Sequence, residues 1–181
     1  MKKRRGKATR KEIKKAPILR QWFQSPVARF LLWFLAFTAL LFAISLAPFA
    51  DGMMQHLVLL DAKCSASILN LAGERSRLAG ATFIGGNGIT VLRGCSAIEY
   101  VWFYCAALLA FPSPPMKKAI GIGLGTLALL FLNLTRIITL QVASVHCPGF
   151  FRFFHEEVWD ILLVTAILLF CLIWIRWVQR I

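Results

Sequence analysis

Three side chains of types that can perform acyl transfer stand where polar loops meet apolar runs. Cys95 lies in "LRGCSAIEY", Arg136 in "NLTRIITL" and His155 in "FFRFFHEEVWD". A cysteine thiolate attacks a carbonyl carbon, a histidine moves the proton, and a guanidinium can stabilise the oxyanion that forms. Cys95 also stands at the predicted start of a helix, which favours the thiolate form. These three residues are therefore the candidate catalytic group.

Three further polar residues are candidates for holding the catalytic side chains in place. Asn133 lies one helical turn before Arg136 on the same face, where it could orient the guanidinium. Glu99 lies one turn beyond the cysteine and could hold either the histidine or the arginine. Asp160 is a weaker candidate for the same task.

Each of these residues also has an ordinary structural explanation. Arg136 could extend its charged end to lipid headgroups, and His155 could belong to an aromatic belt at the membrane surface. Cys95 could be a packing residue, and Glu99 could be a first-turn charge that favours the helix dipole. However, Arg136 lies within an apolar run, where an ionisable residue is a functional hypothesis. The catalytic interpretation therefore depends on the three residues meeting.

The composition is that of a membrane protein. Of 181 residues, 59% are hydrophobic and only 16% are charged, which is too apolar for a typical soluble domain. The net charge of +13 is concentrated at the N-terminus, because 11 of the 21 Lys and Arg residues fall in the first 29 positions. Such a segment beside a membrane span faces the cytoplasm and anionic headgroups. We therefore expect membrane lipids, and not nucleic acid, as its partner.

The sequence predicts an all-α polytopic membrane protein, with a basic cytoplasmic tail over residues 1–26 and one transmembrane domain over residues 27–181. Both ends are expected inside, because this places the tail and the later basic residues on the inner side, as the positive-inside rule requires. Seven of the eight acidic residues then lie outside or at the outer edge. About four spans are expected, over residues 27–49, 96–111, 119–141 and 157–176.

The segment 50–94 is expected on the outer side. Residues 53–72 carry Asp61 and Lys63 in their middle, which disfavours a span, and a spanning segment there would place the later basic residues outside. We therefore predict an amphipathic helix on the outer surface or against the bundle. A short β-hairpin is predicted within residues 81–92 around "GGNG". The apolar stripe of the helix consists of Met53, Leu57, Leu60, Cys64, Ile68 and Leu71.

These spans bring the candidate catalytic residues to one depth. Cys95 lies 17 residues, roughly 26 Å, from the proline turn, and Arg136 lies 18 residues, roughly 27 Å, from Lys118. His155 stands at the outer start of the fourth span. Three spans therefore present the cysteine, the arginine and the histidine at the outer rim, where a bundle of this size could place them in contact.

The other cysteines carry weaker signals. Cys105 and Cys171 lie in apolar runs and are expected to be packing residues. Cys64 and Cys147 lie outside in the predicted topology, where a disulfide between them is left open. The five cysteines show no CxxC pair and no metal-ligand spacing, so neither a metal nor a cofactor is expected.

Two other functions remain open at this point. Several outer cysteines would suit a four-span thiol–disulfide oxidoreductase that passes electrons to a quinone, although such an enzyme would be expected to carry a CxxC pair. A non-enzymatic membrane scaffold would use the basic tail as its contact surface, but this function leaves the intramembrane Arg136 unexplained.

The segments "RGCSAIE", "NLTR" and "FFHEEVWD", in this order and at this spacing, resemble the exosortase/archaeosortase family of membrane cysteine transpeptidases. The resemblance covers roughly residues 30–176, and the short chain is similar to the compact exosortase H type. It implies that Cys95 is the nucleophile, Arg136 the family's arginine and His155 the proton-transfer group. The family often has Gly two residues after the cysteine, where this chain has Ala97.

The resemblance also implies a substrate class and a location. The family's substrates are exported proteins with a C-terminal sorting signal, which consists of a short motif, an apolar helix and a basic end. The enzyme would cut at the motif, form an acyl-enzyme at Cys95 and pass the acyl group to an amine or to water. Such an enzyme lies in the bacterial inner membrane, with its active site facing the periplasm or exterior.

Overall fold

The structure is a computed structural model that describes residues 25–84 and 89–180, without the side chain of Arg93. Nearly all of the predicted tail over residues 1–26 lies outside the described residues, as does the "GGNG" loop. The described part is helical with one small β-hairpin, as the sequence predicts. In chain order its elements are α2 (Pro26–Ser45), α3 (Pro48–Leu71), β1 (Arg77–Ala79), β2 (Thr82–Ile84), η1 (Arg93–Cys95), α4 (Ile98–Ala110), α5 (Pro115–His146), η2 (Pro148–Phe150), α6 (Phe151–Phe153), η3 (Phe154–Val158) and α7 (Trp159–Gln179).

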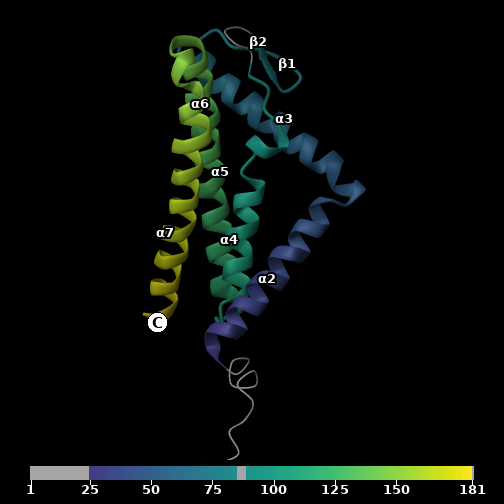
Figure 1. Ribbon diagram of the computed structural model, residues 1–181, viewed down its shortest axis with the longest axis vertical. Helices are drawn as coiled ribbons and strands as arrows, with labels where there is room; N and C mark the ends of the chain where they lie inside the picture. Colours follow the sequence, from purple (N-terminus) through teal and green to yellow (C-terminus); the bar gives the residue numbers. More distant parts are fainter. Residues whose placement is uncertain (1–24, 85–88, 181) are drawn as a thin grey trace, which may run out of the picture.

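Helices α4, α5 and α7 lie side by side and form the central bundle (Figure 1). Its best-packed apolar cluster consists of Tyr104, Leu108, Leu129 and Trp174. Helix α5 turns back from α4 after prolines at 112 and 114, and Pro115 occupies its first turn. Proline is well placed there, because the first N–H groups of a helix have no partner within the helix.

The bundle has two ends, which we name by their landmarks. The hairpin end carries β1, β2, η1 and α6, and the terminal end carries the start of α2, the turn between α4 and α5, and the C-terminus (Figure 1). The start of α2 and the end of α7 therefore share one end of the bundle. This arrangement agrees with a topology in which both chain ends face the same side of the membrane.

Three helical segments are long and apolar enough to cross a membrane: α2, α5 and the continuous stretch Pro148–Gln179. Helix α4 is apolar but has only 13 residues, about 20 Å, which is shorter than a hydrocarbon core of about 30 Å. The helices extend beyond the predicted spans: α5 continues past both ends of 119–141, and the last helical stretch begins before residue 157. The chain is a multi-pass membrane protein.

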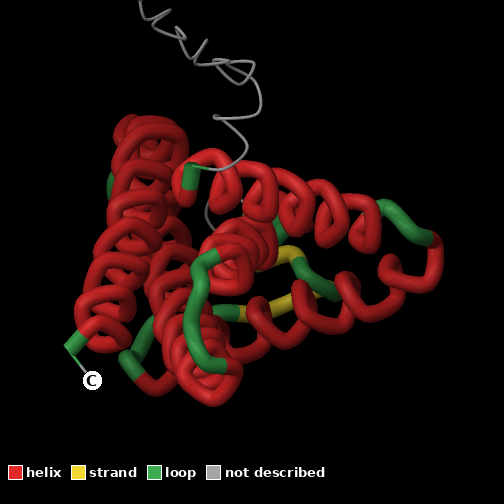
Figure 2. The backbone as a smooth tube through the Cα atoms, turned by 90° about the horizontal axis from the view of Figure 1, so that it is seen from below, coloured by secondary structure: helices red, strands yellow, loops and turns green. Residues whose placement is uncertain are grey.

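Helices α2 and α3 leave the bundle and meet at its side (Figure 2). Ser25 caps α2 by accepting a hydrogen bond from the Ala28 N–H at 3.1 Å, and Pro26 occupies the first turn. Helix α2 packs mainly against α4, whereas α3 returns obliquely toward the hairpin end and packs against α5 (Figure 1).

The face of α3 that packs is not the predicted apolar stripe. Met53, Leu60, Ile68 and Leu71 are exposed, as is Cys64. The small side chains of the buried face allow α3 to approach α5 closely, which decides the rotation of the helix. The buried residues of α3 are Ala50, Met54, Val58, Ala62, Ser65, Ala66 and Leu69.

The segment after α3 folds into more strand pairing than the sequence predicts. Strands β1 and β2 pair antiparallel around Gly80, whose φ of 64° is favourable only for glycine. The predicted hairpin is the second pairing, in which the Phe83 N–H donates to the Ile89 carbonyl and the Val91 N–H to the Ala81 carbonyl. Phe83 and Val91 are buried against α3 and α5, so this segment forms the wall above α4.

Candidate active site

Cys95 lies just before α4, in the loop that closes the hairpin end of the bundle. It ends the 3₁₀-helix η1, in which its N–H donates to the Leu92 carbonyl at 2.9 Å. Ala97 is the N-cap of α4, so the thiol stands beside the positive end of that helix. The Cys95 side chain is partly buried, whereas the next two residues are fully buried. The thiol is therefore partly accessible, while buried neighbours and a backbone hydrogen bond hold the chain that carries it.

His155 lies in a widened helical turn at the start of the last span. Residues Phe154–Val158 form the π-helix η3 between α6 and α7. Such turns carry one extra residue and are frequent at functional sites. The ring of Phe151 stacks on the imidazole, with centroids 5.7 Å apart and planes inclined by 26°. The phenyl ring and the π turn together orient the imidazole.

The structure brings the cysteine and the histidine together. The Cys95 Sγ lies 3.9 Å from the His155 Nε2, within reach of a sulfur hydrogen bond. Both side chains line a cavity of about 610 Å³, a volume typical of small-molecule and peptide side-chain sites. Its other walls are residues 89–92 and Gly94 and, on α5 and beyond, Ile137, Leu140, Ser144, Pro148 and Phe151.

Arg136 lies beside this pair rather than between its members. Its Nη2 donates to the Asp160 Oδ1 at 3.3 Å, and the Tyr100 hydroxyl donates to the same oxygen at 3.0 Å. Asp160, on α7, therefore holds the Arg136 guanidinium in place, the task for which it was the weaker candidate. Through the same oxygen it joins α7 to α5 and α4. The neighbouring Ile137 lines the cavity, and no hydrogen bond joins Arg136 to Cys95 or His155.

The guanidinium of Arg136 does not extend to lipid headgroups. The residue is 3% exposed and lies ten positions before the end of α5. Its Nε and Nη1 are buried, and among the described residues neither has a hydrogen-bond partner. An unpaired buried donor is costly, so these two nitrogen atoms of Arg136 call for an explanation.

Asn133 does not orient Arg136, contrary to the prediction. Its Nδ2 donates instead to the Asp61 Oδ2 on α3 at 3.1 Å. The side chain is fully buried, and its Oδ1 has no partner among the described residues. Burial raises the pKa of the Asp61 carboxyl, although the hydrogen bond from Asn133 acts in the opposite direction. Asn133 therefore fixes α3 to α5 beneath the candidate site.

Glu99 differs from the sequence expectation, and Ala97 stands where the family often has Gly. Glu99 is exposed and is joined neither to His155 nor to Arg136, so a supporting role for it is not favoured. Ala97 is fully buried with a φ of −71°, a conformation that any residue adopts. Its methyl group is not part of the cavity wall, so the alanine does not narrow the cavity beside Cys95.

In the part of the chain that the structure describes, the remaining cysteines and the acidic residues form no second centre. All five cysteines are free, and the Cys64 and Cys147 side chains are exposed. Within residues 25–84 and 89–180, no three His, Cys, Asp or Glu side chains gather as metal ligands would. The residues that sequence reasoning missed are Tyr100 and Asp61. Asp61 gave a signal, since a carboxylate in the middle of an apolar segment calls for a partner.

Comparison with protein families identifies the chain. It matches the family model described as "Transmembrane exosortase (Exosortase_EpsH)" over residues 21–173. Comparisons with curated proteins and with solved structures found no match. The matched range contains the cysteine, the arginine, the histidine and the three candidate supporting residues. Because the match extends over most of its length, the chain belongs to the transmembrane exosortase family.

Proposed function

We propose that this protein is a cysteine transpeptidase that cleaves the C-terminal sorting signals of exported proteins. Family membership supports a membrane transpeptidase and sorting role in general. The observation that carries the specific proposal is the 3.9 Å separation of the Cys95 Sγ and the His155 Nε2 beside a cavity that both residues line. A nucleophile, a proton acceptor and a space for the substrate therefore occur together.

In the first half-reaction, the His155 imidazole takes the thiol proton and the Cys95 sulfur attacks the scissile carbonyl. The carbonyl oxygen becomes an oxyanion, for which Arg136 offers buried N–H donors close to the cavity wall. The carbon–nitrogen bond then breaks, and the imidazolium returns its proton to the leaving amine. The products are a thioester at Cys95 and the released C-terminal tail.

In the second half-reaction, an amine or a water molecule attacks the thioester. His155 accepts the proton of the incoming group, and the sulfur leaves as a thiolate that is reprotonated. An amine acceptor yields a transferred protein, and water yields a simply cleaved one. Asp160 and Tyr100 act as positioning residues, because they hold Arg136 through one carboxylate oxygen.

The location of the site suits a substrate tethered in the same bilayer. The cavity lies between the loop before α4, the second half of α5 and the short helical stretch η2–η3 that precedes α7. A sorting signal whose apolar helix crosses the membrane would present its motif at this level. The basic N-terminal segment supports an orientation with the hairpin end outside. We expect reporter fusions after residue 75 to be active outside and fusions after residue 116 inside.

Co-expression with a tail-bearing exported protein from the same genome tests the function. The wild-type chain should remove the tail, and Cys95→Ala should leave the full-length substrate at equal membrane expression. Cys64→Ser with Cys147→Ser is the matched control, because both thiols are exposed and neither lines the cavity. If this double variant lost as much processing as Cys95→Ala, a redox reaction of several cysteines would replace the proposal.

A further inference from the structure

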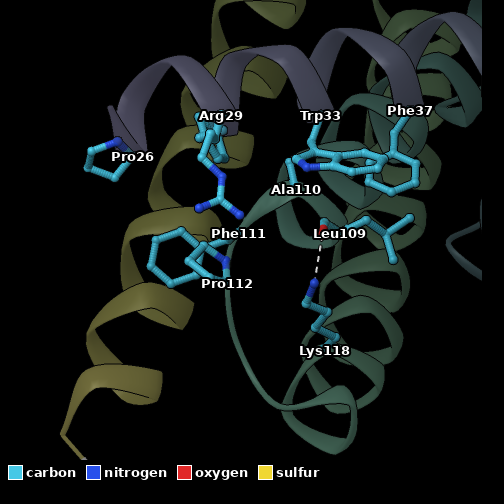
Figure 3. A pocket seen from close by; sticks show the side chains of 10 residues that line it. Pro26, Arg29, Trp33, Phe37, Leu109, Ala110, Phe111, Pro112 and Lys118 are labelled. Carbon is cyan, nitrogen blue, oxygen red and sulfur yellow. Dashed lines mark hydrogen bonds between the residues drawn. The ribbon is translucent and has the colours of Figure 1, made fainter. Parts of the chain in front are cut away.

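A second cavity lies at the terminal end, far along the bundle from Cys95. It has a volume of about 360 Å³ and is formed between the first three turns of α2 and the turn from α4 to α5 (Figure 3). This volume is at the low end of the roughly 300–1,000 Å³ of small-molecule sites. Nothing in the proposed reaction uses this cavity, because every group in that reaction lies at the hairpin end.

Two cationic side chains from different helices reach this cavity. Arg29 descends from α2, and Lys118 rises from the first turn of α5 (Figure 3). Lys118 uses one of its three N–H donors for the Leu109 carbonyl at 2.6 Å, where it caps the end of α4. None of the described residues gives the Arg29 guanidinium a hydrogen bond or a carboxylate. Both cations therefore retain donors for an anion.

The rest of the lining is apolar and rich in rings. It includes Phe30, Trp33 and Phe37 on α2 and Phe111 after α4, and no acidic residue belongs to the described wall. A small soluble anion would use the two cations but not the rings. An amphipathic ligand with an anionic head and an apolar body would use both halves of the cavity.

The position of the cavity along the bundle narrows the choice of ligand. It lies in the first turns of two helices that are long and apolar enough to span, so it stands at the level of lipid headgroups. The preceding residues 1–24 contain ten Lys and Arg and only one acidic residue, which further attracts anionic lipid. Trp33 and Phe37 follow Arg29 deeper along α2, where acyl chains begin.

We propose that this cavity binds an anionic phospholipid. Arg29 and Lys118 hold its phosphate, and the glycerol and the upper acyl chains lie against the rings of α2. Bound lipid would join the first turn of α2 to the turn between α4 and α5, and so reinforce the packing of α2 against the bundle. The site differs from the general attraction of a basic tail, because it depends on two specific residues that point into one hollow.

Native mass spectrometry of the full-length protein in detergent tests this proposal with phosphatidylglycerol and, as the neutral counterpart, phosphatidylcholine of the same chains. The wild type should retain phosphatidylglycerol preferentially. Arg29→Gln with Lys118→Gln should weaken this binding about 30-fold, since each headgroup-level cation contributes about fivefold. Arg176→Gln with Arg180→Gln removes the same charge at the same end, outside the cavity, and should retain the lipid.

Arg29→Glu guards against a double variant that fails to fold. An acidic residue in the first turn favours the dipole of α2, so this variant should fold while it repels a phosphate. Equal losses in the cavity variant and the Arg176/Arg180 control, or no preference for phosphatidylglycerol, would overturn the proposal. Displacement of the lipid by inorganic phosphate at similar concentration would also overturn it, because the rings would then contribute nothing.

Discussion

The two ends of the α4–α5–α7 bundle use the same helices in different ways. At the terminal end two ring donors are paired: the Tyr104 hydroxyl donates to the Gly121 carbonyl at 2.9 Å, and the Trp174 indole to the Lys117 carbonyl at 3.0 Å. The rings lie directly against the glycines of α5. A Cβ added at Gly121 would overlap the Trp174 ring, and one added at Gly125 would overlap the Tyr104 ring. Within this cluster the rings fit closely against α5 and both ring donors have partners.

The hairpin end has the opposite character. It contains an open cavity, a thiol next to an imidazole, and an arginine with two buried nitrogen atoms that have no partner among the described residues. Unpaired buried donors reduce stability, and proteins retain them where a ligand completes the pairing. We therefore propose that the Tyr104–Trp174 cluster supplies rigidity, whereas Arg136 at the hairpin end receives the oxyanion of the proposed reaction.

The largest effect is expected at the hairpin end from His155→Gln. Glutamine keeps polarity and similar size but cannot accept the thiol proton, so processing of a tail-bearing substrate should fall by about 10²–10⁴-fold. His146→Gln is the control, because His146 is an exposed histidine at the same end that pairs with Glu74 at 2.9 Å. Processing by His155→Gln at the level of this control would remove the histidine from the mechanism.

Arg136→Lys is expected to be almost as damaging as Arg136→Ala, with processing reduced by about 100-fold in both. Lysine supplies a charge but not the planar fork, so it cannot serve both Asp160 and a substrate oxygen in the same geometry. Arg152→Lys, in an exposed pair with Glu156, should have no effect. Near wild-type processing by Arg136→Lys would make the arginine a simple anchor of α5.

The candidate site could be predicted from the sequence only in part. Hydropathy and span length place Cys95 and His155 at one depth, and the structure has them in contact. The choice of Asp160 over Glu99 or Asn133 as the partner of Arg136 depends on how each helix is rotated. Hydropathy does not fix that rotation in a membrane, because lipid-facing and protein-facing sides are both apolar.

The fold shows the same division between what hydropathy fixes and what packing decides. The apolar runs predicted α2, α5 and α7, since long apolar segments must form helices in lipid. The π turn at His155 adds one residue to a helix, which rotates the following face by about 100°, and composition carries no sign of it. The buried face of α3 was missed because it includes small residues such as Ala62, Ser65 and Ala66, whereas the predicted stripe consisted mainly of larger apolar side chains.

At the terminal end, Gly121→Ala should lower stability by about 1–3 kcal/mol, because the added methyl group overlaps the Trp174 ring and the Leu108 side chain. Gly123→Ala is the matched control in the same helix, since nothing lies within 4 Å of its added Cβ. The control should be neutral or slightly stabilising. Thermal unfolding in detergent measures both, and equal melting temperatures would show that the terminal end is not tightly packed.

The smallest effect, and the sharpest contrast between the two ends, is expected from two tyrosines one turn apart on α4. Tyr100→Phe removes the hydroxyl that donates to Asp160 at 3.0 Å. Asp160 keeps Arg136 and is half exposed, so water replaces the lost donor and processing should fall only about fivefold, through turnover rather than substrate binding.

Tyr104→Phe removes the hydroxyl that donates to the Gly121 carbonyl in the buried cluster, and should lower stability by about 1 kcal/mol with unchanged processing per folded molecule. Measuring processing and melting temperature for both variants tests the division directly. If Tyr104→Phe impaired processing as much as Tyr100→Phe at equal folding, the two ends would be coupled and the separation of rigidity from chemistry would be wrong.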